Sequence, residues 1–368
     1  MRHRLNNLTA VISRNHNPYK NLAIEKFLLE NVCPGRVFLY LWQNEKTVVC
    51  GRNQNIWKEC RAEKLLEDGG FPARRLSGGG AVFHDLGNLN FTFIACEKDY
   101  SIDRQLEVII KACAAFGIEV QKTGRNDITA GKAKFSGNAF YKANPNDFAD
   151  KVIRCYHHGT LMVDVNKDAL SLYLNADKEK YESKGVDSVK SRVINLKELK
   201  PEITVGSLAA EMVKAFEEVY GGTADVFGIR NSECGIRNLE FGMRNAADQD
   251  PEAGILGPED VKDFNITRGE WDYIKKTAEF FASDEWLYRN NIKFNVRFSH
   301  RFSFGDLDLR FLVEKGIIKK SALYSDAMDE EYILEIAGRL KKTEGRSYSI
   351  RLIEDALDNK EISGVLLH

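Results

Sequence analysis

The chain has 368 residues, of which 43% are hydrophobic and 29% charged, so it can bury a large core and divide into more than one domain. Its 53 Lys and Arg nearly balance its 54 Asp and Glu, which leaves no overall positive field to draw it onto nucleic acid or anionic lipid. Seven cysteines without a Cys-x-x-Cys pair argue against a structural zinc site or a disulfide framework, and no apolar run reaches the roughly 18 residues of a membrane span. We therefore expect a cytoplasmic protein with free thiols that binds neither nucleic acid nor a membrane.

The first half of the chain mixes strands and helices without strict alternation. Period-two patterns predict strands, and apolar residues at helical spacing after an Asn-Pro entry predict the first helix. In chain order, strands are expected at 8–13, 36–43, 46–53, 87–95 and 154–165, and helices at 17–32, 60–70 and 102–117. A polar turn is expected between the second and third strands. Leu89, Phe91 and Phe93 should share one face of their strand.

A heptad repeat interrupts the second half. Between Phe227 and Ala247 the sequence reads FGIRNSE, CGIRNLE and FGMRNAA, with glycine at every seventh position. The unit is too short for a solenoid repeat, and its glycines do not suit a coiled coil. We interpret residues 227–247 as a tandem duplication inserted in a tolerant loop, and 248–260 as a continuation of the same irregular insertion.

The last part of the sequence has a different pattern. After a helix at 270–283, turn signals at Gly305-Asp306 and Lys315-Gly316 separate three alternating strands within 295–326. A helix follows at 329–342, with acidic residues early and basic residues late, as its dipole favours. The sequence therefore predicts an α+β fold: a large domain with mixed or antiparallel sheets and a small C-terminal α+β unit that begins near residue 291.

Residues 74–94, RRLSGGGAVFHDLGNLNFTFI, carry the clearest chemical signal. Three glycines allow backbone amides to approach a phosphate or a carboxyl group, and Arg74 and Arg75 could pair with its oxygens. A second glycine-rich stretch, GRNDITAGKAKFSG, is not a Walker loop, because six residues separate Gly124 from Gly131 and Ala133 follows Lys132. Lys132 is expected in solvent, whereas Lys134 lies on a strand whose small following residues permit a close ligand.

Together these segments resemble the lipoate-protein ligase A family. The motifs are RRLSGGGAVFHDLGN, GRNDI, KFSGNAFY, HHGTLMVD and KGVDSVKSRVINL, with NPYKNLAIE, WKEC and RFSFGDLDLRFLVEKG in support. They stand in the order and near the spacing of that family. The resemblance covers nearly all of the chain except the heptad insertion and the last dozen or so residues.

The resemblance implies a biotin/lipoate-ligase-like catalytic domain over 1–290, interrupted by the insertion at 227–260, and an accessory domain over 291–368. Family members activate lipoate with ATP to give lipoyl-AMP, and then transfer the lipoyl group to a lysine of a carrier. The carriers are the E2 subunits of 2-oxoacid dehydrogenases and the glycine-cleavage H protein. Mg²⁺ is expected, held mainly by phosphates and water, with its protein ligands unassigned. A monomer is expected, and rotation of the accessory domain accompanies adenylate formation in the family.

Residue roles also follow from the resemblance. Lys134 would be the catalytic residue, contacting the lipoyl carbonyl and the phosphate, and Arg75 would meet the nucleotide or pyrophosphate. Residues of one run, Gly80, Ala81, Val82 and Phe83, would line the adenylate, and Val82, Phe83 and Leu161 are candidates for the acyl slot. Asn88 and Asp127 would make polar contacts near the phosphates and metal. Residues 181–196 match the family's adenylate loop and are a candidate lid.

Alternatives stay open for the histidines and for the reaction. His84, His157 and His158 are possible acid–base groups, but neighbouring strand residues face opposite ways, so histidines satisfied within the core are the simpler interpretation. An octanoyl or lipoyl transferase of the same fold would need a thioester-forming cysteine, and Cys96 and Cys155 have core-like surroundings. A biotin ligase would need a basic Gly-Arg-Gly loop that is absent. An inactive lipoate-binding relative would be expected to lose the lysine or the glycines.

Overall fold

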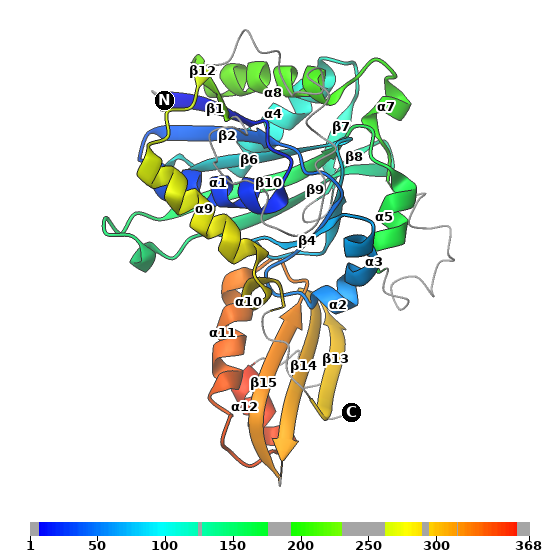
Figure 1. Cartoon of the computed structure of the whole chain (residues 1–368), viewed down its shortest axis with the longest axis vertical. Helices are drawn as coiled ribbons and strands as arrows, with labels where there is room; N and C mark the ends of the chain where they lie inside the picture. Colours follow the sequence, from blue (N-terminus) through cyan, green and yellow to red (C-terminus); the bar gives the residue numbers. More distant parts are fainter. Residues whose placement is uncertain are drawn as a thin grey trace.

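The computed structural model describes residues 7–123, 127–175, 193–229, 262–288, 294–314 and 316–358. Three sheets organise these residues into a larger part and a smaller C-terminal part (Figure 1). The predicted α+β class is confirmed, because helices cover a large mixed sheet and a separate small antiparallel sheet.

The large sheet has nine strands in the order β12-β11-β1-β2-β6-β10-β9-β8-β7. Strands β12, β11, β1 and β2 run parallel to one another, and each pairing from β2 through β6, β10, β9 and β8 to β7 is antiparallel. In chain order the strands are β1 (Asn7–Ser13), β2 (Arg36–Trp42), β6 (Asn88–Cys96), β7 (Val120–Thr123), β8 (Asp127–Ala130), β9 (Ala133–Lys142), β10 (Arg154–Met162), β11 (Ala224–Ile229) and β12 (Lys262–Asp263).

Long helices cover both faces of this sheet. Helices α4 (Ile102–Ala114) and α8 (Val205–Tyr220) pack together over one face, whose core holds the predicted row Leu89, Phe91 and Phe93. Helix α1 (Pro18–Asn31) covers the opposite face with α9 (Arg268–Ala282) beside it. The Asn17 side chain caps α1 by accepting from the amides of Tyr19 and Lys20, as the Asn-Pro entry predicted.

A second sheet of three short strands supports the glycine-rich segment. It has the order β4-β3-β5, with β3 (Thr47–Cys50) parallel to β4 (Phe71–Arg74) and antiparallel to β5 (Val82–His84). The strands expected at 36–43 and 46–53 both form, but β2 joins the large sheet and β3 the small one. Shorter helical elements complete this part: α2 (Ile56–Glu59), α3 (Ala62–Glu67), η1 (Glu97–Asp99), η2 (Pro145–Asp147), α5 (Lys167–Tyr173), α7 (Leu196–Leu199) and α10 (Asp284–Leu287).

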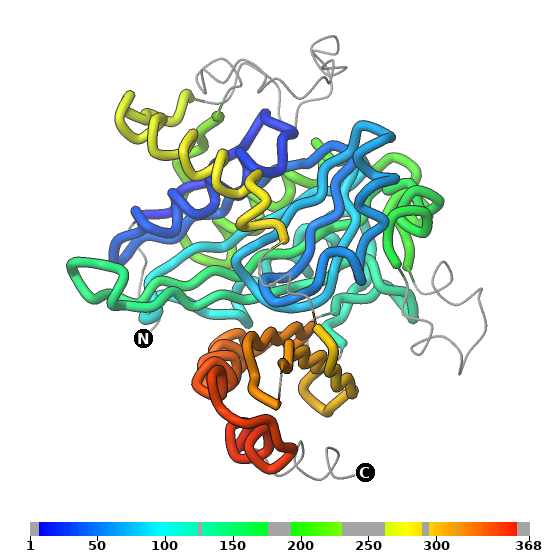
Figure 2. The backbone as a smooth tube through the Cα atoms, turned by 60° about the horizontal axis from the view of Figure 1, so that its bottom comes forward, coloured from blue at the N-terminus to red at the C-terminus, as the bar shows by residue number. Residues whose placement is uncertain are grey.

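The C-terminal unit has its own sheet and its own core. Strands β13 (Val296–Phe302), β14 (Gly305–Glu314) and β15 (Ile317–Ser325) form the predicted antiparallel hairpins. Helices α11 (Glu330–Lys341) and α12 (Ile350–Leu357) pack on them around a separate hydrophobic cluster. Figure 2 shows this unit, orange to red, beneath the larger part. The boundary predicted at residue 290 falls in 289–293, outside the described residues, so it stays a prediction.

The C-terminal unit touches the larger part beside the glycine-rich segment. The amide of Ser325 donates to the Asn53 carbonyl at 3.0 Å, and the amide of Gly79 donates to the Ala327 carbonyl at 3.1 Å. Arg52 Nη1 lies 2.7 Å from Glu330 Oε1, with both side chains largely buried. The unit is therefore bonded directly to the segment that carries the three glycines.

The interpretation of the heptad repeat needs one correction. The loop was expected to begin at Phe227, but Phe227, Gly228 and Ile229 belong to β11, which pairs in parallel with β1. Apolar side chains here extend the sheet because β1 supplies a row of backbone partners. The remainder of the repeat lies in 230–261, outside the described residues.

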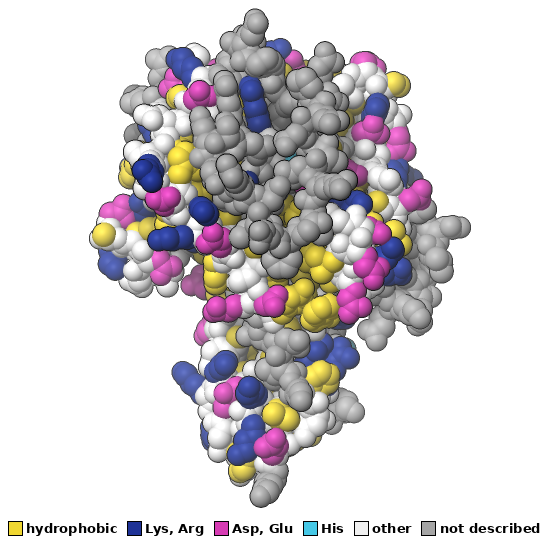
Figure 3. Space-filling view, viewed as in Figure 1, with side chains coloured by type: hydrophobic (Ala, Val, Ile, Leu, Met, Phe, Trp, Pro, Cys, Tyr) yellow, Lys and Arg dark blue, Asp and Glu magenta, His cyan; other side chains and the backbone are white. Residues whose placement is uncertain are grey.

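The surface agrees with the balanced composition. On the described surface of the face in Figure 3, basic and acidic side chains are interspersed, without a large area of one sign. Among the helices that the structure describes, none has the length and apolar character needed to cross a bilayer.

Candidate functional site

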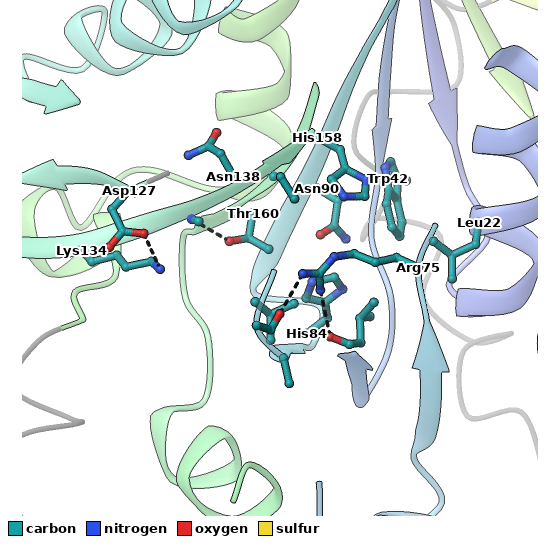
Figure 4. Close-up of a pocket in the computed structure, with 17 residues that line it drawn as sticks. Leu22, Trp42, Arg75, His84, Asn90, Asp127, Lys134, Asn138, His158 and Thr160 are labelled. Carbon is teal, nitrogen blue, oxygen red and sulfur yellow. Dashed lines mark hydrogen bonds and ion pairs between the residues drawn. The ribbon is translucent and has the colours of Figure 1, made fainter. Parts of the chain in front are cut away.

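A pocket of about 240 Å³ lies on the α1 face of the large sheet, between that sheet and strands β3 and β5. We call residues 75–81 the glycine loop. The walls come from α1, both sheets and the glycine loop: Leu22, Trp42, Val49, Arg75, Gly80, Ala81, Val82, His84, Asn90, Asp127, Lys134, Gly137, Asn138, Ala139, His158, Gly159 and Thr160. In Figure 4, Lys134 and Asp127 stand at one end and Trp42 and Leu22 at the other.

The two ends differ in exposure. The side chains of Lys134 and Asp127 are 36% and 38% exposed, whereas Trp42 and His84 are each 3% exposed. We call these the outer and inner ends of the pocket. A ligand that reacts with a second protein would present its reactive group at the outer end.

Six of the eight predicted site residues line this pocket: Arg75, Gly80, Ala81, Val82, Asp127 and Lys134. Phe83 does not, because residues alternate along β5 and its ring points into the α4–α8 core, stacked on Tyr173. Asn88 does not line it either. It is fully buried, and its Nδ2 donates to Asn90 Oδ1 at 2.9 Å. Leu161, a candidate for the acyl slot, likewise lies in the α4–α8 core.

Lys134 is paired with Asp127 at the outer end. Its Nζ lies 2.7 Å from Asp127 Oδ1, across the adjacent strands β8 and β9 (Figure 4). Gly137 makes room for it, since a Cβ there would lie 3.2 Å from Nζ. A Cβ at Gly159 would lie 2.7 Å from the Gly137 carbonyl oxygen. The small residues after Lys134 thus allow the close approach that their sequence suggested. Lys132 is exposed, as expected.

Arg75 holds the glycine loop in shape. Its guanidinium donates to the Gly78 carbonyl at 2.6 Å, the Gly80 carbonyl at 2.8 Å and the Val49 carbonyl at 3.1 Å. Its Nε donates to Ser77 Oγ at 3.1 Å. Burial lowers the pKa of this guanidinium. Arg75 therefore supplies a buried positive charge behind the loop, and a direct contact with a nucleotide stays a prediction.

Arg74 has a different place from the one its sequence suggested. Its side chain is buried away from the pocket, and burial lowers its pKa. The guanidinium donates to the carbonyls of Gln54 at 2.7 Å, Gly51 at 2.9 Å and Leu287 at 2.5 Å. Alternation explains the difference, because neighbouring residues leave a strand in opposite directions. Arg74 thus fastens α10 to the turn after β3, and only Arg75 reaches the pocket.

The three candidate histidines have separate surroundings. His157 and His158 face opposite sides of β10, as predicted: His157 contacts Gln105 and Asn138, and burial lowers its pKa to about 3. His158 lines the pocket, with Nδ1 2.8 Å from Glu25 Oε1 and Nε2 2.7 Å from Ser77 Oγ. The Glu25 carboxylate accepts from Nδ1–H, and Nε2 and the Ser77 hydroxyl lie within hydrogen-bond distance of each other. His158 thus links Glu25 to Ser77, whose hydroxyl oxygen also accepts from Arg75 Nε.

Several residues in or next to the pocket were missed from the sequence. Glu25 does not line the pocket but contacts His158, which does, and this buried carboxylate on α1 also accepts from Thr92 Oγ1 at 2.7 Å. Its signal is a charged residue three positions after Leu22, on the apolar face of a predicted helix. Trp42 and Asn90 had no comparable signal. They line the pocket only because β2 and β6 pair, with Trp42 opposite Asn90.

The candidate lid meets the site at its C-terminal end. Of residues 181–196, 181–192 lie outside the described residues. Val193 forms a parallel bridge with Lys134, and the amide of Ile194 donates to the Lys134 carbonyl at 2.9 Å. The backbone that carries Lys134 is therefore bonded to the chain that leaves this segment.

The described cysteines lie away from the pocket. The six described cysteines are free thiols, as expected, and none of them lines the pocket; Cys234 is outside the described residues. Burial raises the pKa of Cys50 to about 12 and of Cys155 to about 11, so both stay protonated and unreactive. Within the described ranges, no group of three His, Cys, Asp or Glu side chains is placed to hold a metal.

Comparisons with known proteins agree with this geometry. Residues 17–217 match the lipoyl protein ligase A/B catalytic domain, and residues 291–366 match the bacterial lipoate protein ligase C-terminus. A protein of Bdellovibrio bacteriovorus named lipoate-protein ligase A is 34% identical over 354 residues, 95% of this chain and 91% of that protein. The structure of P. falciparum LipL1 in complex with lipoate covers 98% of this chain and 100% of its own, with 28% identity and a TM-score of 0.72. A lipoate-protein ligase A bound with ATP shares the fold at 18% identity and a TM-score of 0.56, over 77% of this chain and 98% of its own.

Proposed function

Because the chain belongs to the lipoate-protein ligase A family, we propose that its pocket builds lipoyl-AMP from lipoate and ATP and presents it to a carrier lysine. The reaction class is protein lipoylation by a ligase. The observation that carries the residue assignment is the position of Lys134, a partly exposed cation at the end of the pocket opposite the buried Trp42.

In the first step, a carboxylate oxygen of lipoate attacks the α-phosphorus of ATP, and the bond to pyrophosphate breaks. Both partners are anions, so cationic and amide donors must offset the charge that grows in the transition state. Lys134 would exchange Asp127 for an α-phosphate oxygen. Arg75 would act from behind, because its contacts to the Gly78 and Gly80 carbonyls hold the loop that faces the phosphates.

In the second step, the carrier lysine attacks the acyl carbonyl and AMP leaves. This lysine must arrive from solvent, which places the carbonyl at the outer end, beside Lys134. The ammonium of Lys134 would then polarise the carbonyl oxygen and stabilise the charge on the departing phosphate. The carriers are lipoyl domains of the kind found in E2 subunits and the glycine-cleavage H protein.

The adenylate must be protected from water until the carrier arrives, since it is a reactive mixed anhydride. The buried inner end excludes solvent from the acyl chain. Residues 181–196 are the proposed cover of the outer end, and two of them, Val193 and Ile194, are bonded to the backbone of Lys134.

Mg²⁺ fits this site only as a metal held mostly by its substrates. Asp127 is the one carboxylate among the described residues that line the pocket. Mg²⁺ commonly binds through one or two carboxylates together with phosphates and water. Asp127 is therefore the residue that would hold it, and the charge it supplies would assist binding of the triphosphate.

The transferase alternative lacks its nucleophile in the described part of the chain. A thioester mechanism needs a thiolate at the pocket. Every described cysteine lies outside the pocket, and burial raises the pKa of Cys50, Cys113 and Cys155. An inactive relative is also disfavoured, because the lysine and the glycine loop are both in place.

The test is ATP-dependent transfer of lipoate to a purified apo lipoyl domain. The intact protein, Lys134→Ala and Lys132→Ala are compared, since Lys132 is an exposed lysine two positions away. We expect Lys134→Ala to lose about 100-fold or more in rate, as for removal of a preorganised charge donor, and Lys132→Ala to keep its rate.

Each other outcome has a definite meaning. Equal losses in both variants would contradict the special role of Lys134. Formation of lipoyl-AMP without transfer would place the fault in the carrier. Folded, intact protein that performs neither step would overturn the ligase assignment and favour a lipoate-binding protein.

A further inference from the structure

His84 carries a hydrogen-bonding atom that its surroundings leave unpaired. Its side chain lines the inner end of the pocket and is 3% exposed. Nε2 is buried and has no hydrogen-bond partner among the residues that the structure describes. The pKa of this imidazole is lowered to about 3, mainly by burial and secondly by the charges of Arg75 and His158. The ring is therefore neutral near neutral pH. A buried polar atom without a partner costs free energy unless a ligand or water supplies one.

A chain of buried amides determines which ring nitrogen of His84 carries the proton. Asn21 Oδ1 accepts from Ser13 Oγ at 2.7 Å, so Nδ2 is the atom that faces the carbonyls of Asn15 and Gln43, both at 2.8 Å, and Asn44 Oδ1 at 3.0 Å; these three oxygens share its two hydrogens. Asn44 Nδ2 is then the atom that faces His84 Nδ1 at 3.2 Å. Because an amide nitrogen only donates, Nδ1 accepts and the proton of the neutral ring lies on Nε2.

The acyl tail of a bound substrate would end near this donor. From the Lys134 strand to the Trp42 strand the order is β9-β10-β6-β2, three strand spacings, or about 14 Å. With the carbonyl at Lys134, the far end of a medium-length acyl chain extends toward Trp42. The rings of Trp42 and His84 stand edge to face with centroids 6.1 Å apart. The tail would therefore meet an aromatic ring and an unpaired N–H.

We propose that the Nε2–H of His84 selects the dithiolane tail of lipoate over a plain alkyl tail such as that of octanoate. A ring sulfur accepts a weak hydrogen bond and makes favourable contacts with aromatic rings such as Trp42. A terminal methyl group accepts nothing, and leaves the buried N–H unpaired in the occupied pocket. The proposal rests on the function proposed above, because it takes the acyl carbonyl to lie at Lys134.

The direct measurement is nitrogen NMR of the intact protein labelled with ¹⁵N-histidine, alone, with lipoate and with octanoate. We expect the His84 signals of a ring protonated at Nε2, and a shift of Nε2 on adding lipoate that octanoate does not reproduce. An Nδ1-protonated ring, or the same shift with both acids, would overturn the proposal. This experiment needs no variant and so does not depend on how a substitution folds.

Kinetics provide the second measurement, through the ratio of kcat/KM for lipoate to that for octanoate in adenylate formation. His84→Leu removes the donor, and we expect the ratio to fall about threefold to tenfold, which is the range for the net contribution of one hydrogen bond, because sulfur accepts weakly. His84→Gln keeps an N–H and should retain more of the ratio. Equal losses for both acids would mean that His84 acts only structurally. Lys134→Ala should instead remove activity with both acids, which separates failure of the specificity proposal from failure of the ligase assignment.

Discussion

Lys134 Nζ and Asp127 Oδ1 lie 2.7 Å apart, so the proposed catalytic cation is already paired before a substrate binds. Both side chains are more than a third exposed, and exposed ion pairs contribute only about 0–1 kcal/mol. A phosphate oxygen can therefore replace Asp127 at little cost. The pair keeps the ammonium directed into the pocket without holding it there.

Asp127→Asn tests this arrangement, because it keeps the size of the side chain and removes its charge. We expect the rate of lipoyl-AMP formation to fall about tenfold to 100-fold as the ammonium loses its fixed direction. The free energy of unfolding should change by less than about 1 kcal/mol. Pyrophosphate release and urea unfolding measure the two quantities. Glu97→Gln is the matched control, since Glu97 forms a similarly exposed pair with Lys142. A full-rate Asp127→Asn enzyme would show that the pair has no part in catalysis.

Arg74→Met should destabilise the protein strongly. The guanidinium donates to carbonyls of Gly51, Gln54 and Leu287, which stay buried when the donor is removed. We expect the free energy of unfolding to fall by at least about 3 kcal/mol, measured by urea denaturation. The exposed Arg61→Met should change it by less than about 0.5 kcal/mol. Similar stabilities for the two variants would contradict the structural role of Arg74.

The first and third glycines of the loop should respond differently to alanine. A Cβ at Gly78 would lie 2.6 Å from the Ala327 carbonyl oxygen, whereas a Cβ at Gly80 meets nothing within 4 Å. Gly78→Ala should push the C-terminal unit away and speed amide hydrogen exchange in 325–330. Gly80→Ala should leave that exchange unchanged. Unchanged exchange in both variants would mean that the contact at Ala327 yields without moving the unit.

Acid should destabilise the fold partly through His84 and His157. Burial lowers the pKa of both from 6.5 to about 3, so across this interval the unfolded chain binds protons that the folded chain refuses. Stability should therefore rise with pH through the interval and be fully present above 6.5, with a slope of about 1.4 kcal/mol per pH unit for each histidine. Urea unfolding of the intact protein and His157→Gln at about pH 5 and pH 7 would show it. The variant should lose less stability on acidification, and an equal loss would exclude His157 as a source.

Local pattern predicted most elements, including α1 with its cap, the central strands and the C-terminal hairpins. It did not reveal that β2 and β3 enter different sheets, because the polar turn between them looks the same in either case. Which sheet each strand joins depends on its pairing partners, β1 and β6 for β2, and β4 and β5 for β3. For the same reason Trp42 and Asn90, opposite each other on β2 and β6, were missed as pocket residues.

The candidate site was likewise predicted in part from local motifs and in part not. The motifs pointed to Lys134, Asp127 and Arg75, and all three line the pocket. Within the run Gly80 to Phe83, strand alternation sends the Phe83 ring into the opposite core, so it does not line the pocket, and a contact of this residue with the adenylate stays a prediction. Strand alternation also turns the Arg74 side chain away from the pocket. For these two residues strand alternation in the sequence would have been enough, whereas only the structure shows that Asn90 lines the pocket and Asn88, two residues before it on the same strand, does not.

The contact between the glycine loop and the C-terminal unit restricts the residue type at position 78 but not at position 327. Ala327 contributes its carbonyl oxygen, which every amino acid possesses, whereas position 78 must lack a Cβ altogether. The two positions should therefore tolerate substitution to different degrees during evolution. In a set of related chains, the residue at position 327 should vary among side chains that fit the core of the C-terminal unit. Position 78 should remain glycine. An engineer grafting a foreign C-terminal unit onto this catalytic part would accordingly match backbone path before side-chain identity.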